Sequence, residues 1–261
     1  MRRVFCAITI CGFASFLDAK PRVSIITSVY NGDEFIEGFL QDQVQQSIFN
    51  ECELLLINAN SPGNEEPIIK KYMEQYPNIV YKKLDKDPGI YGVWNLGVHM
   101  AQADLVTNAN LDDRRNPVAL EMQVKLLEEN SDIDLAYGDL AMTLISPNQE
   151  QKQVFISITP EFTGPEAIRF CLPGPQPVWR KSMHQKYGYF DESFFSSGDW
   201  DMWCRAVSKG ALFKKVPNCV TGLYYQNPVG ISTDPDEKKT KRRNAENERI
   251  IQMYSYLWDN H

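Results

Sequence analysis

Short apolar segments alternate with segments of helical periodicity through the first half of this chain, and this alternation constrains its fold more than any other feature. The segment Val23-Ser24-Ile25-Ile26-Thr27-Ser28-Val29 is nearly continuously apolar, as expected for a strand buried on both faces. Further strands are expected at 54–57, 79–81, 105–107 and from 135 onward. Helices are predicted between them over 33–46, 65–75 and 93–101. This order predicts an α/β fold with a mostly parallel, Rossmann-like sheet that carries helices on both faces.

A further helix is expected after the fourth strand. Asn116 is the residue type that caps a helix, and Pro117 suits the first helical position. We therefore predict that this helix begins at Pro117 with Asn116 as its cap.

Polar loops follow three of the predicted strands at the point where each strand ends. They are Tyr30-Asn31, Asn58 to Ser61, and Asn110 to Asp113. Ligands of parallel sheets bind beyond the carboxyl ends of the strands, so we expect the loops to converge on one site. Asn, Ser and Gly are also common turn residues, so it is the shared edge that indicates a site.

The adjacent carboxylates of Asp112 and Asp113 are costly to hold together without a counter-charge. Mg²⁺ or Mn²⁺ would supply that charge, since such cations bind through one or two carboxylates together with substrate phosphates. The pair therefore indicates an enzyme that acts on a nucleotide phosphate. Arg114 and Arg115 either balance these carboxylates, contact phosphate or are surface charges, and the sequence leaves these readings open.

Composition excludes several other classes of protein. The formal net charge is −7, whereas nucleic-acid binders usually carry a basic face, so no nucleic-acid partner is expected. No two of the cysteines form a Cys-x-x-Cys pair, which argues against a zinc site. These properties leave an ordinary globular enzyme or binding protein.

Residues 1–19 form a leader of a different kind from the rest of the chain. Arg2 and Arg3 precede an apolar run from Val4 to Leu17, which resembles a secretory signal peptide. The run is short for a membrane span, which needs about 20 apolar residues. If the leader is cleaved we expect export, and if it is retained we expect membrane association on the cytoplasmic face.

Two longer motifs resemble family 2 glycosyltransferases of the GT-A fold, bacterial type. The run from Asp87 to Gly97 is similar to the pattern D-x-G-I-Y-D-A-x-N-x-G of one bacterial branch, which often carries Asn-x-Asp-Asp as in 110–113. The segments 188–194 and 198–205 are similar to the acceptor-side region that ends in E-D-W-D-L-W-x-R. The resemblance covers about 21–227 and implies a nucleotide-sugar half at about 21–115 and an acceptor half at about 116–227. We expect a C-terminal helical extension at 228–261.

The resemblance implies an inverting, metal-dependent enzyme of cell-envelope or surface glycan synthesis. It would move a sugar from a nucleotide sugar, with a UDP-sugar favoured, to a hydroxyl of a glycan or lipid-linked acceptor. Asp112 would hold Mn²⁺ or Mg²⁺, and Asp113 would be a second ligand or a support, of which we favour the support. Asp199 would be the general base, because a sugar hydroxyl needs a positioned carboxylate to take its proton. Asp201 is the alternative base or an acceptor contact.

The same resemblance assigns the other site residues. The nucleotide-sugar-binding positions are Thr27, Tyr30, Asn31, Asn58, Ser61, Asp87, Gly89, Tyr91, Asn95 and Asn110. The acceptor-side positions are Trp200, Asp201 and His184. The segment 224–228 lies where some relatives close a loop over the donor, and because it contains no His we expect no metal ligand from it.

Three positions depart from the family pattern. Asn58 stands where an acidic residue is usual, Gly92 replaces Asp and Gly198 replaces Glu. These changes motivate an alternative function, a carbohydrate- or nucleotide-binding protein of the same fold that has lost catalysis. The basic cluster at 238–243 and the amphipathic run at 250–258 predict a helix that contacts anionic lipid or packs by one face, and we favour packing.

Overall fold

The computed structural model describes residues 20–258, so the predicted leader at 1–19 lies outside it. Within these residues nine strands form one sheet in the order β3-β2-β1-β4-β8-β6-β9-β5, with β7 paired to β6. The strands are β1 (Val23–Val29), β2 (Cys52–Asn58), β3 (Ile79–Lys83), β4 (Leu105–Asn108), β5 (Arg114–Arg115), β6 (Leu135–Thr143), β7 (Phe155–Ser157), β8 (Val178–Arg180) and β9 (Phe213–Tyr225). Strands β1 to β4 are parallel, and β8 runs antiparallel to both β4 and β6. The predicted α/β fold with a mostly parallel sheet is confirmed.

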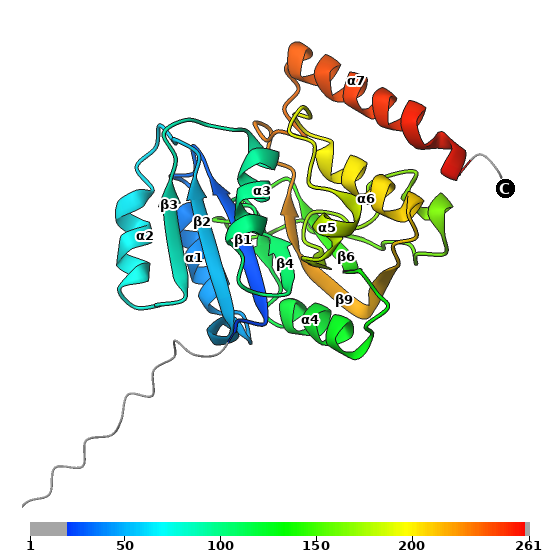
Figure 1. The fold of residues 1–261 in the computed structure, drawn as a ribbon. Helices are drawn as coiled ribbons and strands as arrows, with labels where there is room; N and C mark the ends of the chain where they lie inside the picture. Colours follow the sequence, from blue (N-terminus) through cyan, green and yellow to red (C-terminus); the bar gives the residue numbers. More distant parts are fainter. Residues whose placement is uncertain (1–19, 259–261) are drawn as a thin grey trace, which may run out of the picture.

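Helices cover both faces of this sheet (Figure 1). They are α1 (Ile36–Val44), α2 (Glu66–Met73), α3 (Ile90–Met100), α4 (Ala119–Glu129), α5 (Met183–Tyr187), α6 (Gly198–Ser208) and α7 (Glu237–Tyr254). Successive β1 side chains point to opposite faces, as the pleat requires. Ile25 packs in the cluster that includes α1, α2 and α4, whereas Ile26 packs in the cluster that includes α3, α5 and α6. Both side chains are fully buried, which explains why β1 is apolar without alternation.

The expected start of the fourth helix was wrong. Helix α4 begins at Ala119, its N-cap is Val118, and no side chain caps it. The Oδ1 atom of Asn116 accepts a hydrogen bond from the Val118 N–H at 3.2 Å, which forms a turn before the helix. The backbone N–H of Asn116 donates to the Thr221 carbonyl of β9, so pairing with the sheet holds this residue outside the helix.

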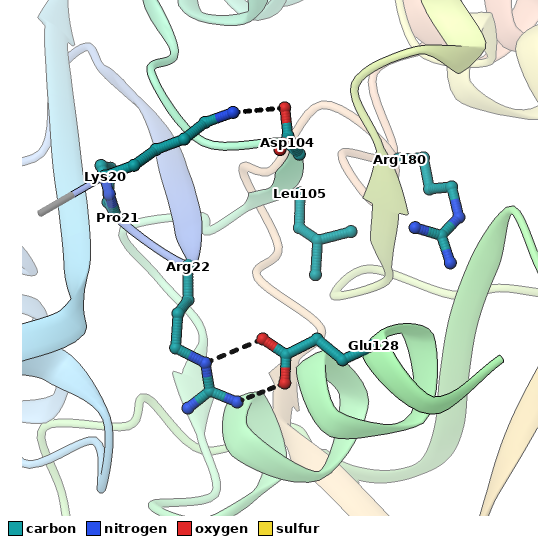
Figure 2. Close-up of a pocket in the computed structure, with 7 residues that line it drawn as sticks. All are labelled: Lys20, Pro21, Arg22, Asp104, Leu105, Glu128 and Arg180. Carbon is teal, nitrogen blue, oxygen red and sulfur yellow. Dashed lines mark hydrogen bonds and ion pairs between the residues drawn. The ribbon is translucent and has the colours of Figure 1, made fainter. Parts of the chain in front are cut away.

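The amino-terminal edge of the sheet carries a cavity of about 260 Å³ (Figure 2). Four of its charged side chains form two ion pairs, and the fifth, Arg180, donates to backbone carbonyls. Lys20 Nζ lies 2.6 Å from Asp104 Oδ1, and Arg22 Nη2 lies 2.7 Å from Glu128 Oε2. The cavity lies where β1 and β4 begin, opposite the edge at which the polar loops end, so we do not assign the predicted chemistry to it. No helix within 20–258 is long and apolar enough to cross a membrane.

Candidate active site

The structure brings together the loops that follow β1, β2 and β4. The Asn31 N–H donates to Ser61 Oγ at 2.8 Å, and the Gly32 N–H donates to Glu65 Oε1 at 2.6 Å. Asn31 has a φ of 48°, a conformation that Asn tolerates better than most residues, so the chain can turn sharply at the end of β1. A Cβ added at Gly32 would overlap the Leu111 side chain, so only a glycine lets the first loop approach the loop of Asp112 this closely.

Asp112 lies half-buried after β4, with one carboxylate oxygen engaged and the other free. Its Oδ2 accepts a hydrogen bond from Asn227 Nδ2 at 2.9 Å. Its Oδ1 has no hydrogen-bond partner among residues 20–258, so this atom is available to a ligand. Asn227 follows β9, and its own Oδ1 accepts from the Val229 N–H, which fixes the orientation of its amide. The segment after β9 therefore reaches the predicted metal residue Asp112 through the amide of Asn227.

Asp113 is buried and holds its neighbours in place. Its Oδ1 accepts from the Tyr225 N–H at 3.1 Å, and its Oδ2 accepts from Asn110 Nδ2 at 3.0 Å. Burial and the adjacent charge of Asp112 raise the pKa of Asp113 to about 8. Both oxygens are used within the protein, which supports our preference for Asp113 as a support. Asn110, which was predicted to contact the nucleotide, is thus hydrogen-bonded to Asp113 through its side-chain amide.

The two arginines after this pair have different surroundings. The Arg114 guanidinium donates to the carbonyls of Leu111 and Asp113 and to Asn148 Oδ1. Arg115 is 2 % exposed and donates to Thr107 and Gln123 side chains and to the Asn108 carbonyl. Arg115 is therefore neither a surface charge nor a phosphate contact, because its guanidinium is enclosed by the sheet and α4.

The site fits a divalent cation that is completed by a substrate. Among residues 20–258 no group of three or more His, Cys, Asp or Glu side chains is arranged to hold a metal alone. Mg²⁺ and Mn²⁺ need no such cage, because one or two carboxylates with phosphates and water suffice. The free Oδ1 atom of Asp112 provides such a ligand. It belongs to the residue next to Asp113, whose pKa is raised by burial and by the charge of Asp112.

Asp199 lies in the first turn of α6, where two donors face its carboxylate. Tyr91 Oη donates to Oδ1 at 3.2 Å, and Cys171 Sγ donates to Oδ2 at 3.5 Å. Burial raises the pKa of Asp199, and these hydrogen bonds together with nearby backbone N–H groups counteract part of that shift. A buried carboxylate whose pKa is raised is a stronger proton acceptor than an exposed one, as a general base requires.

Tyr224, near the end of β9, is influenced by the carboxylates of both candidate centres. Burial raises the pKa of its phenol, and the charges of Asp113, Asp112 and Asp199 raise that pKa further. Nothing in the local sequence pattern predicts Tyr224 as part of the site.

Several predicted contacts are used within the protein. Asn95 donates to the Phe190 carbonyl and to Glu192, and accepts from the Phe190 N–H, so its amide joins α3 to the segment before α6. Trp200 is buried, and its indole donates to the Ile168 carbonyl. Asp201 accepts from Arg205 and Tyr254, so its carboxylate links α6 to α7.

His184 is a core residue and lies apart from the predicted acceptor side. It is 2 % exposed, and its Nε2 accepts from the Trp179 indole at 2.9 Å. Burial lowers the pKa of His184 to about 4, which keeps the imidazole neutral. The acceptor role considered for His184 is therefore set aside, because its ring is packed among aromatic side chains.

The predicted nucleotide-binding positions divide into exposed and enclosed groups. Tyr30 is half exposed. Asp87 is exposed, and its Oδ1 accepts a hydrogen bond from the backbone N–H of Gly89, a residue with a φ of 79°. Thr27 is fully buried. Asn58 is 2 % exposed, and its Oδ1 accepts from the Ser61 N–H at 2.8 Å. A base N–H could therefore bond to this oxygen only through its second lone pair.

The departures at Gly92 and Gly198 both lie where a side chain would meet close neighbours. A Cβ added at Gly198 would lie 2.8 Å from Cε2 of Tyr91, and one at Gly92 would lie 2.8 Å from Cβ of Pro88. A larger residue at 198 would displace the ring whose hydroxyl bonds to Asp199. The absence of a side chain at 198 therefore makes room for Tyr91 rather than merely removing a contact.

Four functional neighbours were missed in the sequence. Glu65 joins two loops, Asn227 bonds to Asp112, Cys171 bonds to Asp199, and Glu246 accepts from the turn before α6. Glu65 and Asn227 lie close to recognised loops, so their polarity was a usable signal. Cys171 and Glu246 are remote in sequence from their partners, and only the fold reveals them.

The sheet, the carboxylate after β4 and the buried carboxylate that opens α6 define a glycosyltransferase of the GT-A type. The family model described as "Glycosyl transferase family 2" matches residues 24–181, which is more than half of the chain. The chain belongs to this family and is a glycosyltransferase.

Curated relatives agree with this assignment. The uncharacterized glycosyltransferase MJ1057 of Methanocaldococcus jannaschii is 27% identical over 204 residues, which are 74% of this chain and 67% of the relative. The minor teichoic acid biosynthesis protein GgaB of Bacillus subtilis is 29% identical over 115 residues, which are 43% of this chain and 13% of that protein. The chain is thus similar to glycosyltransferases, including a protein named for cell-wall polymer synthesis.

Solved structures show the same fold. S. aureus TarS 1-349 in complex with UDP-GlcNAc superimposes with a TM-score of 0.69 at 16% identity, over 89% of this chain and 71% of the TarS 1-349 chain. The mannosyltransferase PcManGT from Pyrobaculum calidifontis, in complex with GDP-Man and Mn2+, gives a TM-score of 0.64 at 13% identity, over 94% of this chain and 66% of that enzyme. These two proteins bind nucleotide sugars with different bases.

Proposed function

We propose that this chain is an inverting, divalent-metal-dependent glycosyltransferase that moves a sugar from a nucleotide sugar to a hydroxyl acceptor. One observation carries the proposal. Asp112 leaves one carboxylate oxygen free after β4, and Asp199 is a carboxylate that opens α6 and is faced by two donors. The charges of both centres act on the Tyr224 phenol, which supports placing a donor diphosphate held at Asp112 near this base.

On the donor side, Asp112 would bind Mn²⁺ or Mg²⁺, and Asn227 would hold its carboxylate in one orientation. Such a cation would neutralise negative charge on the departing nucleoside diphosphate. Asp113 keeps Asn110 and the end of β9 in place around Asp112. The loops joined by Ser61 and Glu65 form the adjoining wall, where we place the nucleotide.

On the acceptor side, Asp199 would take the proton of the attacking hydroxyl. The hydroxyl oxygen bonds to the anomeric carbon as the bond from that carbon to the diphosphate oxygen breaks. One displacement with a single base inverts the anomeric centre. Of the two candidate bases we favour Asp199, because the carboxylate of Asp201 is bonded to Arg205 and Tyr254. Tyr91 and Cys171 would release or retain their hydrogen bonds as Asp199 becomes protonated.

We propose a UDP-sugar as donor and a glycan or lipid-linked hydroxyl as acceptor, in the synthesis of a cell-envelope polymer. The UDP-GlcNAc complex of TarS and the name of GgaB support this choice, and the GDP-Man complex of PcManGT makes a GDP-sugar the competing donor. The neutral Asn58 can pair with either base, since an amide both donates and accepts hydrogen bonds.

The test uses donor binding and donor hydrolysis. Nucleotide sugars are titrated into the protein with and without Mn²⁺, and donor hydrolysis is then followed without acceptor. We expect one donor to bind at least about tenfold more tightly with Mn²⁺, and this metal effect to vanish in Asp112→Asn. The control Asp132→Asn changes an exposed Asp and should behave as wild type. Metal-independent binding in wild type contradicts the role of the metal, whereas binding with no turnover of any acceptor favours the alternative binding protein.

A further inference from the structure

The carboxylate of Glu246, near the middle of α7, binds the turn that leads into α6. It accepts hydrogen bonds from the backbone N–H groups of Phe195 at 2.6 Å, Ser196 at 2.9 Å and Ser197 at 3.3 Å. Glu246 is 8 % exposed, which is unusual for a glutamate unless its charge is compensated. Successive backbone N–H groups form such a site for an anion.

This contact supplies what the local sequence of α6 lacks. The N-cap residue Ser197 makes no side-chain capping bond to its own helix, and the first helical residue is Gly198. The Ser197 hydroxyl instead donates to Asn247 Oδ1 at 2.7 Å, so it is also directed to α7. A carboxylate at a helix N-terminus also interacts favourably with the helix dipole. The start of α6 is thus held by side chains from another helix.

Helix α7 holds α6 on both sides of Asp199. Glu246 and Asn247 bind the residues before it, and Tyr254 Oη donates to Asp201 Oδ1 at 3.1 Å after it. Figure 1 shows α7 lying along α6, and Ile250 is fully buried between the two tethers. A helix that only packed by its apolar face would not need a buried carboxylate aimed at this backbone.

We propose that Glu246 is a positioning residue for the general base, and that α7 sets the place of Asp199 through the backbone of 195–197. This inference rests on the proposed role of Asp199. Glu246 bonds to the turn before α6 and to Arg242 of its own helix, whereas Asp112 bonds to Asn227 after β9, so the two carboxylates hold different segments. Loss of Glu246 should therefore change the rate of transfer without changing donor affinity.

The test compares Glu246→Ala and Glu246→Gln with Glu248→Gln, which changes an exposed glutamate of the same helix. We expect kcat to fall about 10- to 100-fold in Glu246→Ala, because small misplacements of a catalytic group have effects of this size. The fall should be smaller in Glu246→Gln, which keeps one acceptor oxygen. The Kd for nucleoside diphosphate with Mn²⁺ should remain within about twofold of wild type. The Glu248→Gln control should match wild type in both kcat and Kd.

A second variant keeps the test sharp if Glu246→Ala fails to fold. Asn247→Ala removes only the acceptor of the Ser197 hydroxyl, and it should lower kcat by a few-fold with an unchanged Kd. Wild-type kcat in Glu246→Ala and Asn247→Ala overturns the inference, and so does a loss of kcat that is matched by an equal loss of donor binding or of folded protein. If Asp199→Asn itself transfers sugar at the wild-type rate, the proposed function fails instead.

Discussion

The Tyr91 phenol donates a hydrogen bond to the Asp199 carboxylate over 3.2 Å, and so joins two residues that lie 108 positions apart in the sequence. Tyr91 belongs to the first turn of α3 on the nucleotide side of the sheet, and Asp199 belongs to the first turn of α6 on the acceptor side. The bond therefore joins the nucleotide-sugar half and the acceptor half of the predicted enzyme at Asp199, the proposed general base. Burial raises the pKa of Asp199, and this bond is one of several that lower it.

Tyr91→Phe should move the pH dependence of transfer to higher pH. Burial raises the pKa of Asp199, and the bond from Tyr91 stabilises the carboxylate and lowers that pKa. Without the phenol the pKa rises further, so the base ionises only at higher pH and kcat falls on the acid side. The measurement is a kcat–pH profile from about pH 5 to 9. An acid limb at the wild-type position would show that this bond does not act on the base.

Gly198→Ala should lower kcat because its new Cβ would lie 2.8 Å from Cε2 of Tyr91. The ring must then move, and its hydrogen bond to Asp199 lengthens. In a Tyr91→Ala background the same substitution meets no ring and should cost little. A double-mutant cycle on kcat measures this coupling. Equal effects of Gly198→Ala in both backgrounds would refute the steric account.

Asn227→Ala should weaken donor binding that depends on the metal. It removes the amide that orients Asp112, and a hydrogen bond to a charged group contributes about 1.5–3 kcal/mol. We expect the donor Kd with Mn²⁺ to rise at least about tenfold, while the Kd without metal stays unchanged. Asn244→Ala changes an exposed Asn and serves as the control. An unchanged donor Kd with Mn²⁺ in Asn227→Ala would show that Asn227 does not contribute to donor binding.

Arg115→Met should destabilise the fold by at least about 3 kcal/mol, measured as the free energy of unfolding in urea. The substitution leaves Gln123 Oε1 and the Asn108 carbonyl without this buried donor. Arg169→Met alters an exposed arginine and should leave the urea concentration at the midpoint of unfolding nearly unchanged. A similar midpoint for both variants would mean that these acceptors find other donors.

The first four strands were predictable because their signal is local. Residues of β1 that face opposite sides of the sheet are buried, all but Ser28, so the strand shows as a nearly continuous apolar run. The loops after β1, β2 and β4 were also predictable as neighbours, since parallel strands share a carboxyl edge. The start of α4 was missed because Asn116 pairs with β9, a partner that lies far along the chain.

The predicted site was less complete for the same physical reason. Asn95 and His184 carry the right chemistry for a ligand, yet distant partners occupy their polar atoms. Glu246 carries an ordinary charge in a charged helix, and its burial against 195–197 becomes visible only in three dimensions. Residue type thus predicted candidates, and long-range contacts selected among them.

The most direct measurement of the central claim is the transfer rate of Asp199→Asn at saturating donor and Mn²⁺, with donor affinity measured on the same protein. The account predicts a rate at least about 100-fold below wild type, because general base catalysis contributes about this much, with donor affinity unchanged. A folded Asp199→Asn protein that transfers sugar within about tenfold of the wild-type rate would contradict it.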